Sequence, residues 1–408
     1  MDGAGVEAAL AEAHRREWAA VLAATVRVAG DLDLAEDCTQ DAFVSALQAW
    51  QRDGVPRNPG AWLTTAARRK AVDAHRRGRL LRSKLPLLHL DADPEPPPPD
   101  DGFGDDRLRL IFTCCHPALA REAQVALTLR LVCGLATTDI ARQFLVPEPT
   151  LAARLTRAKK KIAAAHIPYR VPAAAELADR LDAVLTVLHL VFSAGHAAPS
   201  GEQLMRPELV ERAIDLTRLL STLMPDEREV RGLLALMLVT DARRDTRSDG
   251  GELVLLAEQD RTRWDRDLIA EGHRTLLGAL RGGRPGRFTL QAAIAAVHAQ
   301  APSYTDTDWL QIVGLYDVLL AVWPSPVVRL NRAVAVAMLD GPAAGLAELA
   351  ALDDGALAGY HYLPAARADL LRRLGETDRA REQYATALAG AGNDAERRFL
   401  QRRLAELG

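Results

Sequence analysis

The sequence predicts an all-α protein: two small helical domains joined by a flexible linker, followed by a large helical, repeat-like extension. Three observations support this prediction. Apolar residues recur three and four positions apart through most of the 408 residues. Few segments combine Val, Ile, Thr and aromatic residues with period-two alternation, so we expect almost no sheet. One stretch is too rich in Pro and Asp to form a helix interior.

The first domain is expected over residues 7–84, as three helices. Apolar side chains recur at helical spacing over residues 18–26 and again over residues 42–50. The pattern is then broken by three residues that disfavour helix: Pro56, Pro59 and Gly60. A third helix is therefore predicted to start near Ala61.

The composition changes over residues 85–106, which include the run LDADPEPPPPDDGFGDD. Its prolines favour extended backbone and its acids repel one another, so it is expected to be a linker. A second helical domain follows over residues 107–170, and an Ala/Leu-rich helical extension occupies residues 171–408.

The second domain is predicted to end in a helix-turn-helix. A short helix from Thr138 to Phe144 precedes a turn at residues 145–147, and a second helix begins near Glu148. Apolar residues line one face of that second helix, and the opposite face is polar and cationic: Thr150, Arg154, Arg157, Lys159, Lys160 and Lys161. Such a helix fits the major groove, with its early residues at base edges and its cations near phosphates. A solvated surface helix is the alternative.

A second cationic helix is expected over residues 61–84. It carries one acid, Asp73, and eight cations: Arg68, Arg69, Lys70, Arg76, Arg77, Arg79, Arg82 and Lys84. Trp62 precedes them. Cations hold phosphates and an aromatic ring stacks on an unpaired base, so this helix suits a nucleic-acid strand. The alternative is that Trp62 is a core residue.

An acidic helix lies upstream, over residues 31–43. We expect it to expose Glu36, Asp37, Gln40 and Asp41 beside an apolar stripe. An acidic face is better suited to docking on a protein than on DNA. A solvated face is the alternative.

These motifs resemble those of the extracytoplasmic-function (ECF) sigma factors of RNA polymerase. AEDCTQDAFVSALQAW resembles their core-polymerase-binding helix, NPGAWLTTAARRKAVDAHRR their −10 promoter helix, and TTDIARQFLVPEPTLAARLTRAKKKI their −35-reading helix-turn-helix. The resemblance implies two partners, promoter DNA and core RNA polymerase, the latter contacted at the clamp coiled coil of its largest subunit.

The resemblance also assigns roles to residues. The polymerase contact would be made by the acidic helix, through Glu36, Asp37, Gln40 and Asp41. The −10 element would be held or bordered by Trp62, Arg68, Arg69, Lys70, Asp73, Arg76 and Arg77. The −35 element would be read or gripped by Thr150, Arg154 and Arg157, with phosphates held by Lys159, Lys160 and Lys161.

The extension resembles that of one ECF subgroup, in segments such as LAEQDRTRWD and GYHYLPAARADLLRRLG. In that subgroup it is thought to contain tetratricopeptide-like helix pairs. One pair is supported independently by small and large residues in alternation: Leu371, Gly375, Ala380, Tyr384 and Ala387. A second pair is expected over residues 331–352, with Gly341 at its turn. We expect the extension to gate the protein, by packing on the DNA-binding modules or by recruiting a signal partner.

Other site classes receive little support from the sequence. We expect neither a cofactor nor a metal, because Cys114, Cys115 and His116 have no second pair at metal-binding spacing and suit core packing better. Five scattered histidines are expected to be packed or surface residues: His189, His196, His273, His298 and His361. The polar cluster at residues 260–265 is either a hydrogen-bond network between helices or a small-ligand site.

The chain is expected to be cytoplasmic and not an enzyme. It has no apolar segment of signal-peptide or membrane-spanning length, and no nucleophile–base pair or phosphate loop. Two other functions remain open. One is a stand-alone helix-turn-helix regulator with a helical-repeat interaction domain. The other is a helical-repeat adaptor whose basic half is incidental.

Overall fold

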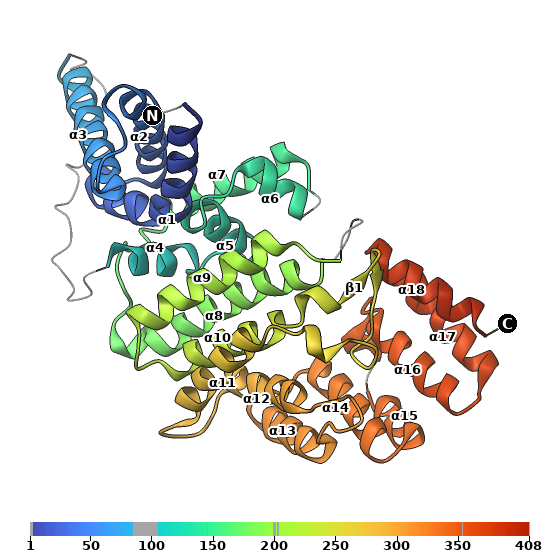
Figure 1. The fold of residues 1–408 in the computed structure, drawn as a ribbon. Helices are drawn as coiled ribbons and strands as arrows, with labels where there is room; N and C mark the ends of the chain where they lie inside the picture. Colours follow the sequence, from blue (N-terminus) through green and yellow to red (C-terminus); the bar gives the residue numbers. More distant parts are fainter. Residues whose placement is uncertain are drawn as a thin grey trace. The chain divides into compact units, whose positions relative to one another are not determined.

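The computed structural model describes residues 3–84, 105–144, 146–198, 201, 204–352 and 354–407. All regular structure in these ranges is helical, apart from a single pair of two-residue strands, which confirms the predicted all-α class (Figure 1). None of the described helices is long and apolar enough to cross a membrane. The contacts divide the chain into two compact units, Met1–Leu188 and His189–Gly408.

The first module of the first unit consists of three helices: α1 (Gly3–Ala29), α2 (Leu32–Asp53) and α3 (Pro59–Lys84). The turn between α1 and α2 uses Gly30, whose φ of +66° is left-handed and suits glycine. Asp31 caps α2 by accepting a hydrogen bond from the Leu34 backbone N–H at 2.8 Å. The module buries large apolar residues from all three helices: Trp18, Leu22, Trp50 and Leu63.

Helix α3 starts two residues before the predicted Ala61. Pro59 is its first residue, where the missing N–H is not needed, and Asn58 caps it by accepting from the Ala61 N–H at 3.0 Å. Gly60 lies against α1, since a Cβ there would be 2.5 Å from Glu17 Oε2. The predicted break between α2 and α3 is confirmed at residues 54–58, but Pro59 and Gly60 lie beyond it, in the first turn of α3.

The second module contains α4 (Asp106–Cys114), α5 (Arg121–Leu127), a π-helical turn (Thr128–Val132), α6 (Thr137–Gln143) and α7 (Glu148–Ala164). Helices α6 and α7 are the predicted helix-turn-helix, with the second helix starting at Glu148 as expected. Ile140 of α6 and Leu151 of α7 are buried. The predicted linker, residues 85–106, lies outside the described residues except for its last two: Asp105 caps α4, and Asp106 is its first residue.

Helix α8 (Ala174–His196) contains the division between the two units, whereas the extension was expected to start at residue 171. The second unit continues with α9 (Pro207–Leu223), α10 (Arg228–Asp241), β1 (Ser248–Asp249), β2 (Glu252–Leu253), α11 (Arg266–Leu280), α12 (Arg287–Gln300), α13 (Trp309–Val322), α14 (Pro326–Leu339), α15 (Pro342–Ala350), α16 (Tyr362–Arg373), α17 (Thr377–Gly390) and α18 (Asp394–Ala405). Short 3-10 helices lie at Arg244–Thr246, Arg261–Arg263 and Asp354–Leu357.

Helices α10 and α12 are held in close contact. Gly232 of α10 allows this approach, because a Cβ there would lie 2.3 Å from Thr289 Oγ1. Glu229, one turn earlier, caps α12 from outside that helix. Its carboxylate accepts from the backbone N–H groups of Gly286 (3.2 Å), Phe288 (2.8 Å) and Thr289 (3.3 Å). The cap satisfies donors that a helix N-terminus leaves unpaired, and so sets the position of α12.

The two predicted helix pairs are present as α14–α15 and α16–α17. Each turn contains a glycine in the left-handed region, Gly341 (φ +95°) in the first pair and Gly375 (φ +78°) in the second. Tyr384 and Ala387 of α17 are buried, as their spacing predicts. These pairs build the C-terminal part of the second unit.

Candidate nucleic-acid and protein interfaces

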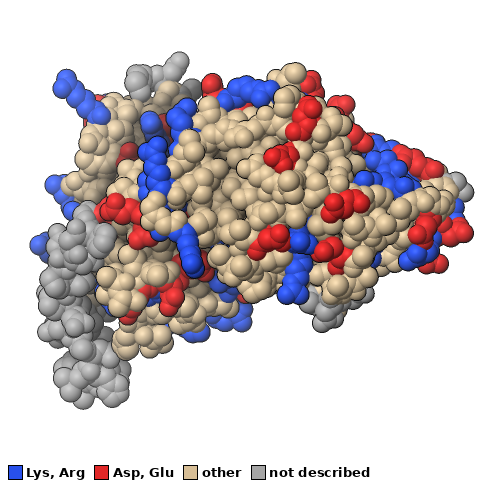
Figure 2. All heavy atoms as spheres, turned by 90° about the horizontal axis from the view of Figure 1, so that it is seen from below, with Lys and Arg blue, Asp and Glu red and all other residues tan. Residues whose placement is uncertain are grey.

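Charged side chains of both signs are interspersed on the face of the molecule drawn in Figure 2, in keeping with a formal net charge of −3. Overall charge therefore does not locate a nucleic-acid site. The predicted cationic surfaces have to be located on individual helices, and both belong to the first unit.

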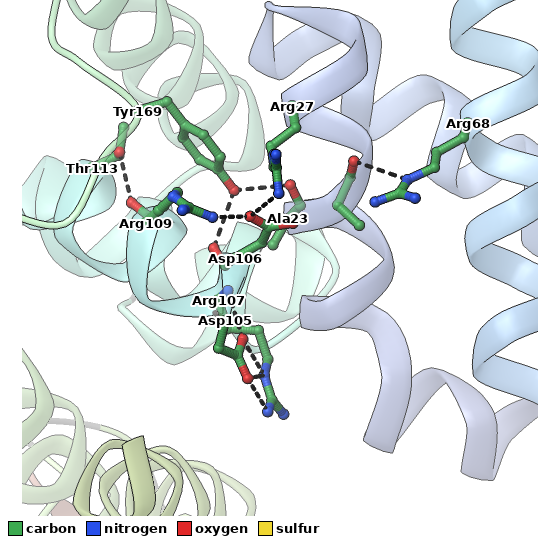
Figure 3. Close-up of polar contacts among 10 residues, drawn as sticks. Ala23, Arg27, Arg68, Asp105, Asp106, Arg107, Arg109, Thr113 and Tyr169 are labelled. Carbon is green, nitrogen blue, oxygen red and sulfur yellow. Dashed lines mark hydrogen bonds and ion pairs between the residues drawn. The ribbon is translucent and has the colours of Figure 1, made fainter. Parts of the chain in front are cut away.

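Helix α3 divides into a buried and a cationic face. Leu63, Ala67 and Ala71 are buried, whereas the four predicted arginines are exposed: Arg68, Arg69, Arg76 and Arg77. Arg68 also donates to the Ala24 carbonyl of α1 at 3.4 Å (Figure 3). Asp73 is exposed among the cations, and Lys70 is partly buried, with Nζ 3.8 Å from Asp41 Oδ2. The predicted −10 cations thus share one face of one helix.

Trp62 lies at the start of α3 and is partly buried. Its ring packs edge-to-face on Trp50, with the ring centroids 5.9 Å apart and an interplanar angle of 70°. Trp50 itself is 1% exposed. Trp62 therefore fits both the core and the base-stacking interpretation. Its ring packs against the core residue Trp50, and part of its side chain remains accessible.

Helix α7 exposes most of its predicted DNA-facing residues: Thr150, Arg157, Lys160 and Lys161. Arg154 is partly buried on the same helix. Its buried residues repeat every three or four positions: Leu151, Leu155, Ala158 and Ile162. This periodicity holds the cationic side of the helix away from the module's core.

Lys159 departs from the expected arrangement. Its Nζ is 2.7 Å from Asp33 Oδ1 and 2.5 Å from Glu36 Oε2, both on α2 of the first module. Arg130 of the second module also forms an ion pair with Glu36. The expectation that Glu36 is exposed is wrong, because these two cations cover it and leave it 5% exposed. Lys159 is likewise turned toward α2, away from the position expected for a phosphate contact.

The electrostatics of this cluster favour the paired, charged form of Lys159. Burial opposes its charge, but hydrogen bonds to Asp33 and Glu36 outweigh that effect and raise its pKa. The neighbouring Asp37 has its pKa raised by burial and by repulsion from Glu36. Asp37 and Asp41 nonetheless remain exposed on α2, as does Gln40, whose Nε2 donates to Glu36 Oε1 at 3.2 Å.

Further hydrogen bonds join the two modules along α1. Trp18 Nε1 donates to the Leu131 carbonyl at 3.0 Å. The Tyr169 hydroxyl lies 3.0 Å from the Ala23 carbonyl and 3.3 Å from the Asp106 carbonyl (Figure 3). Burial, followed by the charge of Asp106, raises the pKa of Tyr169 well above its ordinary value, so its hydroxyl keeps its proton for these contacts. The two modules of the first unit therefore pack against each other, an arrangement that we call the closed packing.

This packing could not be predicted from the sequence. Lys159 is separated from Asp33 by 126 residues, and Trp18 from Leu131 by 113. The periodicity of each helix marked Trp18 as a core residue but carried no information about the partner of its indole N–H. A charge such as Lys159 looks the same in a sequence whether it faces solvent, phosphate or carboxylate.

The cysteines are packed in the interior, as expected from the sequence. Cys114 and Cys115 are buried free thiols, and burial raises the pKa of both, that of Cys115 to about 11. Gln124 donates through Nε2 to the carbonyls of Cys115 (3.2 Å) and His116 (2.8 Å). Across the described ranges, no group of three His, Cys, Asp or Glu side chains is arranged to hold a metal ion.

Comparison with known proteins matches a family to each of the two modules. The family described as Sigma-70 region 2 matches residues 10–80, and the family described as Sigma-70, region 4 matches residues 109–162. A family of unknown function, DUF6596, matches residues 180–280. The uncharacterized protein R00370 of Rhizobium meliloti (strain 1021) is 42% identical over 414 residues, which cover 100% of this chain and 96% of that protein. No solved structure matches the chain.

Proposed function

Since the chain belongs to the sigma-70 factors, as an ECF-type member with a DUF6596 extension, we propose that it binds core RNA polymerase and directs promoter-specific initiation under control of that extension. Sigma factors are not enzymes, and they give promoter specificity to the polymerase that they join. The observation that carries the proposal is the pair of cationic helices, α3 and α7, one in each matched sigma region.

In this proposal α3 serves the −10 element and α7 the −35 element. Arg69, Arg76 and Arg77 on α3 are exposed and have no ion-pair partner among the described residues, so their charge is available to phosphates. The same holds for Arg157 and Lys161 on α7. Trp62 would lend the accessible part of its ring to an unpaired base, which offsets the few kcal/mol of unstacking.

The exposed acids of α2 would dock on the polymerase clamp. Asp37 and Asp41, with Gln40 between them, form one exposed acidic edge of that helix. Lys70 approaches Asp41 only at 3.8 Å and leaves its carboxylate 69% exposed, so the ion pair is weak and easily exchanged for a partner's cation. Glu36 would become available to this edge only when its contact with Lys159 opens.

The closed first unit would have to open before transcription starts. Two promoter elements at separate places on DNA require the two modules to separate, whereas here Lys159 and Arg130 tie α2 to the second module. Polymerase binding along α2 would compete with this contact. We therefore assign the closed packing to the free factor and the separated modules to the polymerase-bound one.

Run-off transcription with core polymerase tests the function. Full-length protein should direct initiation from a promoter with matched −10 and −35 elements, and failure to bind core at mild salt would refute the proposal. A stand-alone regulator would bind the same DNA without core, so co-purification with core separates the two functions. An adaptor without a promoter role would yield no transcript.

Control by the extension is tested by truncation. Residues 1–196 retain α8, because its Arg180 donates to the Phe112 carbonyl at 2.9 Å and so belongs to the packing of the first unit. Altered promoter-dependent activity of this truncated chain supports gating by the extension. We propose that the helix pairs of the extension are tetratricopeptide-like. Unchanged activity would remove the gating proposal and leave the sigma function intact.

A further inference from the structure

The second unit contains a cavity of about 500 Å³ that no part of the proposed function uses. Its walls come from the end of α8 and from α10, α12, α13 and α14. Most of the lining is apolar, including Phe192, Val239, Trp264, Ile294 and Leu319. This volume and composition are typical of pockets that enclose a small organic molecule.

Arg243 supplies a cation to the cavity wall. Its guanidinium makes no hydrogen bond and no ion pair with any of the described residues. The cavity lining contains no Asp or Glu, and the charge of Arg261, another cation, adds to the effect of burial in opposing the charge of Arg243. Burial lowers the pKa of Arg243 to about 10, so it stays charged at neutral pH. Partial burial of an unpaired guanidinium costs free energy of folding, and an anion bound beside it would offset that cost.

Histidines add unpaired polar atoms to the same wall. His196 is 8% exposed, its ring is stacked on Phe192, and neither of its ring nitrogens has a hydrogen-bond partner among the described residues. Nδ1 of His298 is buried and equally unpaired there. Burial lowers the pKa of both rings, so at neutral pH each is an uncharged donor and acceptor.

We infer that this cavity binds a small organic acid, whose carboxylate pairs with Arg243 while its apolar body packs against Trp264 and Phe192. Arginine presents a planar fork of N–H donors that matches a carboxylate, and His196 and His298 can complete the hydrogen bonds of the same ligand. A single fixed cation balances one negative charge, which favours a carboxylate over a phosphate dianion. The proposal does not depend on the sigma function.

The neighbouring arginines have partners within the protein, which leaves Arg243 as the arginine that can bind a ligand in the cavity. The neighbouring Arg244 is paired with Asp241 at 2.7 Å and with Glu211 at 3.1 Å. Arg261 donates to the carbonyls of His298 (2.6 Å) and Ala301 (2.7 Å), and so holds the end of α12. These arginines have structural partners, whereas Arg243 faces the cavity without one. The polar cluster at residues 260–265 is accordingly a hydrogen-bond network that also sets Trp264 into the cavity wall.

Titration calorimetry of the full chain with 2-naphthoate, 2-naphthamide and 2-naphthyl phosphate tests the inference. We expect saturable binding of one naphthoate per chain, and at least tenfold weaker binding of the uncharged amide, because a charged hydrogen bond is lost. No saturable naphthoate binding, or binding of the amide as tight as that of the acid, would overturn the proposal. Tighter binding of the phosphate would overturn the carboxylate assignment.

The variant Arg243→Gln should weaken naphthoate binding about tenfold or more, while the same change at the exposed Arg263 should leave it unchanged. The thermal midpoint of ligand-free Arg243→Gln should equal or exceed that of the wild type, because an unpaired charge is removed. Loss of binding together with a lowered midpoint would indicate that Arg243 is a structural residue and would contradict the inference.

Discussion

Lys159 of the recognition helix α7 is bound to Glu36 of helix α2, with Nζ 2.5 Å from Oε2 and with side chains only 11% and 6% exposed. The pair links a residue expected at promoter phosphates to one expected at polymerase. While the two modules are packed together, Lys159 is not free to contact a phosphate and Glu36 is not free to contact polymerase. Opening the unit would release both groups to solvent, DNA or protein.

Replacing Lys159 by Met should lower the free energy of unfolding of the first unit by about 1–3 kcal/mol, because Asp33 loses its cation and Glu36 keeps only Arg130. Urea unfolding followed by circular dichroism measures the change. Lys161→Met, at an exposed position on the same helix, is the control and should change stability by less than about 0.5 kcal/mol. Equal effects of the two substitutions would contradict a structural role for Lys159.

Reversing the charges of Arg154 and Arg157 to Glu should abolish −35-dependent initiation, because two cations facing phosphates or bases become anions. Run-off transcription on templates with and without the −35 element measures the loss. Arg142→Glu on α6, which is 77% exposed, provides a matched reversal outside the recognition helix. Undiminished initiation by the double variant would refute the groove assignment.

Single cations should also affect the salt dependence of DNA binding. Lys161→Met should reduce the slope of log K against log salt by about 1, since one phosphate contact and its released counterion are lost. Lys159→Met should leave the slope of the free chain unchanged, because Lys159 is held by Asp33 and Glu36. Fluorescence anisotropy at several salt concentrations measures both slopes, and equal slopes for the two variants would argue against this division of roles.

Charge reversal at Asp37 or Asp41 should weaken binding to core polymerase about tenfold or more, because like charges would then meet at the docking surface. Surface plasmon resonance with immobilised core measures the affinity. Asp53→Arg, at the exposed C-terminal end of the same helix, should bind like the wild type. A comparable loss at Asp53 would indicate a diffuse electrostatic effect and not a docking edge.

The second unit should lose stability in mild acid. Burial, aided by Arg287, lowers the pKa of His189 to about 4, and burial with Arg243 and Arg261 does the same for His298. These folded pKa values lie below the unfolded value of about 6.5, so their contribution is complete above pH 6.5 and lost as pH falls toward 4. Thermal midpoints at pH 7.5 and 5 should differ by the equivalent of about 1–2 kcal/mol per histidine. His298→Gln should reduce the difference.

Local sequence predicted the helices well, because each depends on neighbouring residues. The buried stripe of α7, the start of that helix at Glu148 and the turn glycines Gly341 and Gly375 all follow from spacing within a few residues. The errors have the same origin. Pro59 and Gly60 read as helix breakers, yet a proline is tolerated in a first turn, and Gly60 lies in that turn beside Glu17, which is distant in sequence.

The side chains of the binding surfaces were only partly predictable. Arg69 and Arg157 lie on exposed faces that helical periodicity alone identifies. Glu36 lies one helical turn from Gln40 and shares its polar character, but its burial depends on Lys159 and Arg130, which are distant in sequence. The cavity was missed for the same reason: His189, His196 and His298 are scattered along the chain and meet only when α8 and α12 pack together.

The sequence by itself determined the helical class, the two cationic helices and their order along the chain, because hydrophobic periodicity, caps and charge are properties of adjacent residues. Only the tertiary structure decided that Lys159 is held by Glu36 and that Arg243 faces a cavity without a carboxylate. Whether a charge meets a partner, a ligand or water is set by segments far apart in sequence that packing brings together.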